Sequence, residues 1–275
     1  MSQFQSPAPA AAAGPAQQGR GWAGASVLIG QVVIGIALLL FWQLAWTGGW
    51  VDPIIARSPE QVWSALLMLI GDGTLWPSFY ATMEATLMAF VLASVVGVLV
   101  GIGLGLFPRV EELFDPYINA INTMPRIAFA PVFTLYFGIG QEAKIALAFS
   151  IVVFMVMIAA RAGIQNVDRD VVTMARLMGT SRSQMFTKIL LPAATPSIFA
   201  GLKLGVVYSL FGVITSEILS SRIGLGHLIS RFAAVFQLEG MYAVILIMTV
   251  AAAALNGLMT VIERRFLKWS EFDDQ

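Results

Sequence analysis

The chain has 275 residues, of which 58% are hydrophobic and only 12% are charged, with 16 basic and 16 acidic side chains. A soluble globular domain carries about 25% charged residues, so this composition excludes an ordinary soluble protein and predicts a polytopic membrane protein. The absence of cysteine excludes disulfides and thiolate metal sites, and the single histidine, His227, argues against a histidine-ligated metal.

The first 22 residues, 1–22, are rich in Ala, Pro and Gln, which is typical of a disordered segment, here expected to be a cytoplasmic tail. A cleaved signal peptide is the alternative, but the apolar run that follows is too long for the core of one. We therefore expect a first membrane span at residues 25–46. Trp42, Trp46 and Trp50 cluster at its far end, as in an interfacial aromatic belt.

An amphipathic surface helix is predicted after the first span. Ser58 precedes Pro59, and Gln61 can close a capping box, which is a typical helix start. Apolar residues then recur on one helical face, and the Gly-Asp-Gly sequence at residues 71–73 ends the helix.

Five further spans are predicted, so the chain is expected to be an all-α membrane protein with about six transmembrane helices. These spans are expected at residues 80–107, 117–137, 144–160, 196–219 and 240–262. Gly97, Gly101 and Gly105 recur at every fourth position of the second span, a spacing that lets another helix approach closely. Pro125 and Pro131 interrupt the third span and free backbone carbonyl groups there.

The distribution of basic residues orients the spans. With the N-terminus inside, the outer side holds only Arg57, Lys144, Arg222 and Arg231, fewer than half as many basic residues as the inner side. The positive-inside rule therefore predicts that both termini are cytoplasmic, the second as a short tail at residues 263–275. Residues 108–115 become a short charged inner loop, residues 220–239 an outer loop, and residues 161–195 the largest cytoplasmic loop.

The large cytoplasmic loop contains two predicted short helices. The first covers residues 171–178 and is interrupted by Gly179. The second begins at a capping box formed by Ser181 and Gln184, and Pro192 and Pro196 are expected to end it. A polar helix–turn–helix between apolar spans is typical of a docking element.

The spacing within this loop resembles that of a known family. Gly179, nine residues, and then Ile189, Leu191 and Pro192 form the pattern G-x9-I-x-L-P. This pattern is similar to the cytoplasmic EAA loop of ABC-importer permeases, the membrane subunits of binding-protein-dependent transport systems. The resemblance covers roughly residues 53–267, and phrases such as LPAATPSIFAGLKLGV and GLGHLI resemble the nitrate/sulfonate/taurine branch.

By this resemblance the loop supplies a coupling helix that sits in a cleft of the ATPase subunit. Thr173, Met174 and Ala175 take the place of Glu-Ala-Ala, so the first two positions depart from the pattern. Arg176 takes the basic position that often follows, and Gly179 is the turn glycine. The coupling residues implied are Thr173, Met174, Ala175, Arg176, Gly179, Ile189, Leu191 and Pro192.

The resemblance also implies a fold, a location and partners. The fold would be the MetI-like architecture of type I ABC importer permeases in the bacterial inner membrane. The partners would be two ATPase subunits, a second permease copy (a homodimer, or a heterodimer with a paralogue), an external or periplasmic solute-binding protein and membrane lipid, without nucleic acid. The chain itself would be non-catalytic and bind no cofactor or metal, because it lacks the sequence G-x-x-x-x-G-K-[ST] and ATP would be hydrolysed by the partner.

Polar residues within the spans are candidates for the translocation path. Glu217 is the one carboxylate deep in a strongly apolar span, and the alternative is a structural ion pair with Arg222 or Arg231, or a cap. The other candidates are Tyr208, Ser209, Ser216, Asn122 and Asn256. Each of these could instead make an ordinary helix–helix hydrogen bond.

The expected cargo is a small solute, with an organic or inorganic anion (sulfonate, taurine or nitrate-like, or an aromatic acid) implied by the branch resemblance. Arg126 and Lys203, expected near the inner face, are compatible with an anion but equally with the positive-inside bias. An ATP-independent secondary transporter or channel is the alternative function, although one deep carboxylate and no clear repeat argue against it. An intramembrane enzyme is not favoured, because the sequence offers neither paired carboxylates nor a nucleophile–base pair.

Overall fold

The computed structural model describes residues 20–52 and 56–267, and all regular elements in these ranges are helices. The chain divides into two compact units, Met1–Pro59 and Glu60–Gln275. The first contains helix α1 (Arg20–Thr47), and its stretch Ile29–Thr47 is long and apolar enough to cross a membrane. A disordered tail was predicted at residues 1–22. Residues 1–19 lie outside the described residues, and residues 20–22 belong to α1.

The predicted amphipathic helix is α2 (Pro59–Gly71), which begins directly after Ser58. It buries Val62, Leu66 and Leu69, whereas Trp63 and Leu67 are exposed. The helix therefore has one buried apolar face and one exposed apolar face.

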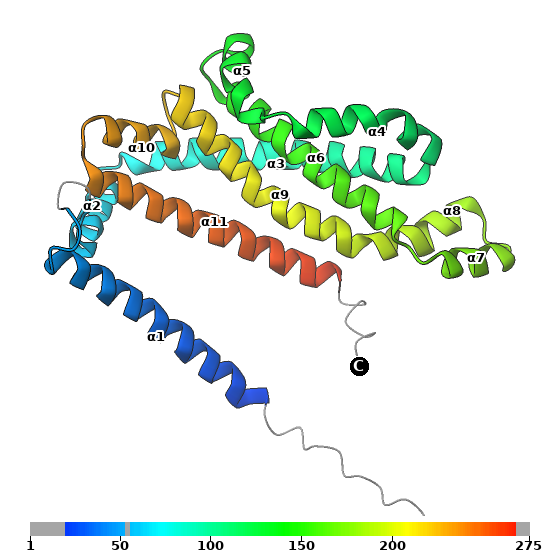
Figure 1. Cartoon of the computed structure of the whole chain (residues 1–275), viewed down its shortest axis with the longest axis horizontal. Coiled ribbons are helices and arrows are strands. Elements are labelled where there is room, and N and C mark those ends of the chain that lie inside the picture. The colour runs from blue at the N-terminus through cyan, green and yellow to red at the C-terminus, as the bar shows by residue number, and fades with distance from the viewer. Residues whose placement is uncertain (1–19, 53–55, 268–275) are drawn as a thin grey trace, which may run out of the picture. The chain divides into compact units, whose positions relative to one another are not determined.

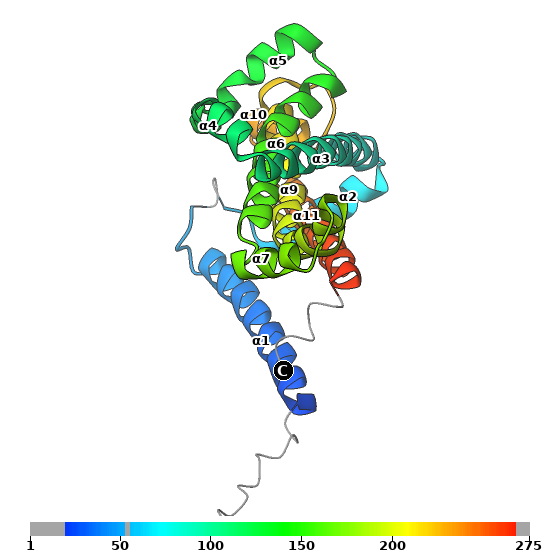
Figure 2. The same cartoon turned by 90° about the vertical axis from the view of Figure 1, so that its right-hand side faces the viewer.

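Three long helices form the centre of the second unit: α3 (Leu75–Leu106), α6 (Gln141–Gln165) and α9 (Leu191–Ser220). They pack against one another, with α6 beside both of the others in Figure 1 and Figure 2. The glycine pattern of the second span is the reason for the close approach. A Cβ atom on Gly101 would lie 2.3 Å from the carbonyl oxygen of Met157, and one on Gly97 would lie 2.8 Å from that of Val153.

The opposite side of α6 meets α9 in the same manner. A Cβ atom on Gly201 would lie 2.4 Å from Cβ of Ala159, and one on Gly212 would lie 2.9 Å from Cα of Ala148. Small residues at both interfaces thus allow α6 to pack closely between α3 and α9, as expected where van der Waals contact drives helix association.

The remaining long helix is α11 (Leu238–Phe266), which packs against α9 and the short helix α10 (Leu225–Ala234). In the described part of the chain, five helical stretches are long and apolar enough to cross a membrane: Ile29–Thr47, Leu75–Leu106, Gln141–Gln165, Arg182–Ser220 and Leu238–Phe266. The predicted outer loop at residues 220–239 is thus largely helical. The predicted tail begins inside α11, and residues 268–275 lie outside the described residues.

The predicted third span is not one continuous helix. Helix α4 (Pro108–Thr123) is followed by a 3-10 turn, η1 (Arg126–Phe129), and by the short helix α5 (Ala130–Phe137). Pro125 explains the break, since it forces Met124 into an extended conformation with ψ of 136°. The prediction of a charged loop at residues 108–115 is wrong. These residues belong to α4, which begins at Pro108, because proline is favoured at the first position of a helix.

The expected helix end at Pro192 and Pro196 is also wrong. A π-helical turn, η2 (Phe186–Leu190), continues directly into α9, which has Pro192 in its first turn and Pro196 inside it. Proline is tolerated in the first turn because its missing N–H has no helical partner there in any case. The fifth span therefore starts about one turn earlier than the sequence indicates.

Candidate functional site

The first part of the candidate coupling loop is helix α7 (Arg169–Leu177). It begins two residues before the predicted start, because the Asp168 side chain caps it by accepting a hydrogen bond from the Asp170 N–H at 2.8 Å. The helix ends where Gly179 adopts a φ of +77°, and the Thr180 N–H then donates to the Ala175 carbonyl at 3.2 Å. Gly179 is therefore the predicted turn residue, in a conformation that favours glycine.

One exposed stripe along α7 is apolar. Val171 is 47% exposed, Met174 is 63% exposed, and Leu177 and Met178 are each 83% exposed, whereas Ala175 is buried. We call Val171, Met174, Leu177 and Met178 the α7 patch. The α7 patch contains Met174, the second departure from the family pattern, so this position presents an apolar side chain outward.

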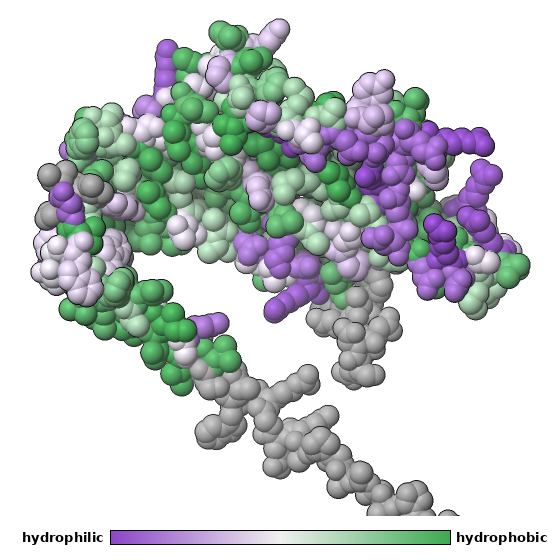
Figure 3. Space-filling view, in the orientation of Figure 1, coloured by the Kyte–Doolittle hydropathy of each residue, from purple (hydrophilic) through white to green (hydrophobic). Residues whose placement is uncertain are grey.

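Charged residues surround the α7 patch. Arg176 and Arg182 are exposed, and hydrophilic side chains gather over α7, α8 and the start of α4, whereas much of the remaining surface is hydrophobic (Figure 3). Thr173, which replaces the family's glutamate, is also exposed and donates its hydroxyl hydrogen to the Arg169 carbonyl at 2.7 Å. The loop thus combines an apolar docking face with basic residues at its edge.

The second part of the loop is the predicted capped helix, α8 (Arg182–Met185). The Ser181 hydroxyl accepts from the Gln184 N–H at 3.3 Å, and the Gln184 side chain accepts from the Ser181 N–H at 3.0 Å. The capping box is therefore confirmed as a local structure.

The I-x-L-P residues connect the loop to the membrane helices. Ile189 and Pro192 line a cavity of about 580 Å³ together with Val171 of α7 and Gly163 of α6. Leu191 instead packs against the buried cluster at the C-terminal end of α6 and the start of α9. Val171 of α7 thus faces the same cavity as residues at the ends of two central helices.

Glu217 is brought to a buried polar cluster at the other end of the central helices. Its side chain is fully buried and forms an ion pair of 2.9 Å with Lys144 of α6. The Thr82 hydroxyl lies 2.9 and 3.0 Å from the two carboxylate oxygens, and the Gly226 N–H donates to Oε2 at 2.9 Å. Lys144 also donates to the Ile223 carbonyl at 2.7 Å. The cluster ties α3, α6, α9 and the start of α10 together.

The geometry of Glu217 favours the structural alternative over direct contact with cargo. The partner is Lys144, however, and not Arg222 or Arg231. The sequence predicts Lys144 on the outer side, at the start of a span, and its side chain is only 2% exposed. The signal in the sequence that could have indicated this ion pair was one lysine at the start of an apolar span and one glutamate at the end of another. Gly224, with a φ of +134°, is required because a Cβ atom there would overlap the Glu217 carboxylate.

The other path candidates separate into two groups. Ser209 and Ser216 are buried within the central helices, where the Ser209 hydroxyl donates to the Val206 carbonyl at 2.8 Å. Tyr208 and Asn256 lie together on a cavity of about 630 Å³ between α9 and α11, with the ion-paired Lys203 and Glu263. Of the predicted path residues, Tyr208 and Asn256 are thus the two that line one cavity.

Asn122 lies apart from these, at the end of α4. Its side-chain oxygen accepts a hydrogen bond from Arg126 Nη2 at 3.0 Å. Arg126 also donates from Nη1 to the Ile151 carbonyl of α6 at 3.2 Å, and its guanidinium carbon lies 4.4 Å from the centre of the Phe154 ring. This arrangement connects the broken third segment to α6.

Sequence comparison connects these features to characterised proteins. The model of the family described as binding-protein-dependent transport system inner membrane component matches residues 93–268. The Escherichia coli aliphatic sulfonates transport permease protein SsuC, a putative assignment, is 31% identical over 235 residues, covering 86% of this chain and 89% of its own. The Escherichia coli taurine transport system permease protein TauC is 28% identical over 241 residues, covering 86% and 87%. The Chloroflexus aurantiacus riboflavin transport system permease protein RibX is 30% identical over 241 residues, covering 88% and 90%.

Solved structures show the same fold. A chain of the MetNI methionine ABC transporter in an inward-facing conformation matches with a TM-score of 0.61 and 16% identity, covering 76% of this chain and 99% of that one. A chain of an amino acid ABC transporter with histidines matches with a TM-score of 0.60 and 19% identity, covering 73% and 97%. The all-α, MetI-like architecture is therefore confirmed.

Proposed function

Because the chain belongs to the family of binding-protein-dependent transport system inner membrane components and is an ABC importer permease, we propose that it imports a small anion by alternating access. Its energy comes from ATP hydrolysed by two separate ATPase subunits. A second permease copy, identical or paralogous, completes the path, and an external solute-binding protein delivers the cargo. Both termini and the 161–195 loop face the cytoplasm of the bacterial inner membrane.

The α7 patch is the observation that supports ATPase docking. Four apolar side chains, each at least 47% exposed, lie on α7 and at the residue directly after it, next to exposed arginine residues. Exposed apolar groups rimmed by charge are typical of protein–protein contacts. We infer that the α7 patch enters a cleft of the ATPase, with Arg176 and Arg182 at the rim.

Transmission follows from the contacts of the loop. Val171 of α7 shares a cavity with Ile189 and Pro192, which lead directly into α9. When the ATPase subunits close, a movement of α7 pushes on this junction and shifts the central helices, which switches access from one side to the other.

The anionic cargo is supported by the names of two relatives, which transport taurine or aliphatic sulfonates. A relative named for riboflavin has comparable identity, so the family as a whole does not fix the cargo. The choice of an anion is further supported by Arg126, a cation within the apolar part of the chain.

Site-specific crosslinking tests the docking proposal. A photo-crosslinking amino acid at Met174 should capture a polypeptide that hydrolyses ATP, because Met174 lies in the middle of the α7 patch. Leu113, an equally exposed apolar residue of α4 at 64%, is the matched control position. Capture of an ATPase at both positions, or at neither, would contradict the proposed docking site.

Uptake into proteoliposomes then tests the function itself. The purified assembly of permease and captured ATPase should take up ethanesulfonate or taurine only with ATP and a binding protein present. Uptake by this chain alone without ATP would instead support an ATP-independent secondary transporter or channel.

A further inference from the structure

Arg126 differs from the three basic residues of the long helices α6 and α9. Lys144 lies 2.9 Å from a carboxylate oxygen, Arg161 lies 2.8 Å from one, and Lys203 lies 3.2 Å from one. For Arg126, no carboxylate lies within ion-pair distance among residues 20–52 and 56–267; its partners there are carbonyl oxygens, an amide oxygen and an aromatic ring. A cation in an apolar environment without a counter-charge is costly, so an anion that reaches it is bound favourably.

The guanidinium group lies near the middle of α6 along its length. Its Nη1 donates to the carbonyl of Ile151, which is about 15 Å from the first residue of α6 and about 21 Å from the last, at 1.5 Å per residue. The hydrocarbon core of a bilayer is about 30 Å thick, so Arg126 lies close to its mid-depth. We infer from this position that Arg126 lies deeper than the inner face expected from the sequence, and well away from lipid headgroups.

Arg126 still has donors available for a ligand. Its hydrogen bonds to Ile151, Ile121 and Asn122 use three of its five N–H groups. The side chain is half-buried, and the neighbouring Asn122 is exposed. A charge-assisted hydrogen bond from a free N–H group to an oxyanion is therefore compatible with the existing bonds.

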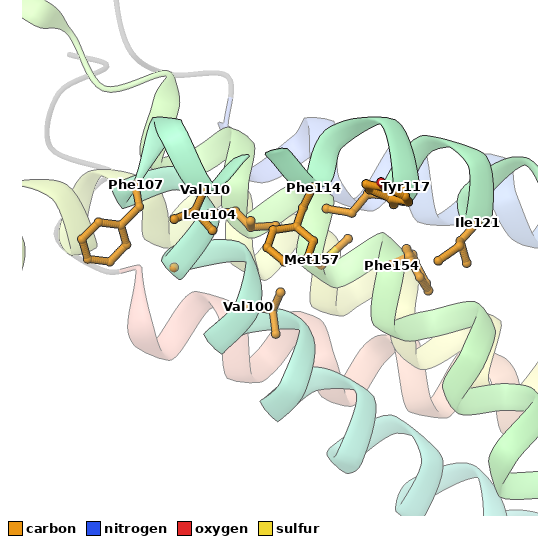
Figure 4. Close-up of a pocket in the computed structure, with 11 residues that line it drawn as sticks. Val100, Leu104, Phe107, Val110, Phe114, Tyr117, Ile121, Phe154 and Met157 are labelled. Carbon is orange, nitrogen blue, oxygen red and sulfur yellow. The ribbon is translucent and has the colours of Figure 1, made fainter. Parts of the chain in front are cut away.

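An apolar cavity of about 490 Å³ is lined by two residues that Arg126 contacts, Ile121 and Phe154. It runs between α3, α4 and α6, from Phe107 and Val110 at one end to Ile121 and Phe154 at the other (Figure 4). Arg126 contacts both residues of that second end, through the Phe154 ring and the Ile121 carbonyl. A charged group and an apolar space are thus adjacent.

We propose that Arg126 and Asn122 bind the acid group of an amphiphilic anion, such as an alkanesulfonate, and that the adjacent cavity takes its alkyl chain. This inference rests on the proposed import of an anion and specifies the chemistry of the cargo. A small inorganic anion would use only the Arg126 end. A neutral cargo would gain nothing from it.

Ligand binding to the permease–ATPase complex tests the charged end without the influence of the binding protein. The complex is placed in nanodiscs of zwitterionic lipid, and the dissociation constant for ethanesulfonate is measured. Arg126→Gln should raise it about 10- to 100-fold, the range for a lost charge-assisted hydrogen bond, whereas Arg126→Lys should retain most of the affinity. Arg109→Gln, a change of an exposed arginine on α4, is the matched control and should have no effect.

A series of methane-, ethane-, butane- and octanesulfonate tests the cavity. Each methylene that enters it should improve affinity about fourfold. Gly103 lines the cavity, and a Cβ atom there would meet nothing within 4 Å, so Gly103→Leu is the change chosen to fill it. This variant should abolish the dependence on chain length but leave methanesulfonate binding intact. Gly257→Leu on α11, where a Cβ atom also meets nothing within 4 Å, is the matched control.

Each result supports or overturns the inference. Equal ethanesulfonate affinity in Arg126→Gln and the unmodified complex overturns it, as does an unchanged chain-length dependence in Gly103→Leu. Loss of binding when anionic lipid is added assigns the site to lipid phosphate instead. If the unmodified complex shows no ATP-driven uptake of any anion, the proposed function itself is refuted. If uptake is normal and Arg126→Gln binds ethanesulfonate normally, only the proposed site at Arg126 is refuted.

Discussion

Replacing Lys144 by methionine should strongly destabilise the protein, because the change leaves the Glu217 carboxylate buried without its cation. Both side chains are at most 2% exposed, and the ion pair is 2.9 Å long. Removing one partner of such a buried pair costs about 3–5 kcal/mol. Thr82 and Gly226 still donate to the carboxylate, so we expect the lower end of this range, about 3 kcal/mol.

The assay is reversible unfolding in mixed micelles by increasing SDS, followed through the fluorescence of the seven tryptophan residues. The double variant, Lys144→Met with Glu217→Leu, should cost at least about 1 kcal/mol less than the sum of the two single changes, because these residues are in direct contact. Lys203→Met is the control. Its ion pair with Glu263 is 35% and 24% exposed, so its loss should cost only about 0–1 kcal/mol.

Two outcomes would refute the reasoning about this cluster. One is a cost for Lys144→Met no larger than that of Lys203→Met, which would mean that the pair is hydrated in the membrane. The other is strict additivity in the double variant, which would mean that Lys144 stabilises the protein through its bond to the Ile223 carbonyl alone.

Three further changes have expected outcomes. Gly101→Leu should prevent stable folding, measured as loss of the monodisperse peak in size-exclusion chromatography, because even a Cβ atom would lie 2.3 Å from the Met157 carbonyl oxygen; Gly257→Leu should fold normally. Gly179→Ala should cost about 1 kcal/mol at the end of α7 because of its φ of +77°, and it should lower ATP-driven uptake more than protein yield. Met174→Asp should weaken ATPase co-purification at unchanged unfolding midpoint, because it places a charge in the exposed α7 patch; unchanged co-purification would contradict the docking face.

The local features of this fold follow from short sequence patterns. Apolar runs predict the long helices, the four-residue glycine spacing predicts the close contact of α3, and Ser181 with Gln184 predicts the capping box. Each depends on residues within one or two helical turns, where geometry and chemistry are fixed by the chain itself.

The partners of buried polar groups could not be predicted in the same way. Lys144 and Glu217 are 73 residues apart, and their contact depends on the register between α6 and α9, which the sequence of either helix does not contain. Pro125 was recognised as an interruption of one span, but the extent of the break depends on the bonds that Arg126 makes to α6. A position on a helix was thus predictable, and a contact across helices was not.

Helix α6 carries all three of the sites described above. Lys144 lies near its start, Ile151 with the bound Arg126 lies near its middle, and Gly163 lies at the cavity beside α7. Because α6 packs against α3 and α9 at distances that leave no room for a Cβ atom at Gly101 or Gly201, bending within this group is costly. We therefore expect α3, α6 and α9 to move as one body when α7 is displaced.

The parts that move relative to these three helices should be those joined to them by fewer and more polar contacts. The main example is α4, which Arg161 and Arg126 connect to α6. On this argument the anion at Arg126 lies at the boundary between the rigid body and a movable helix, where a change of access would open or close its site.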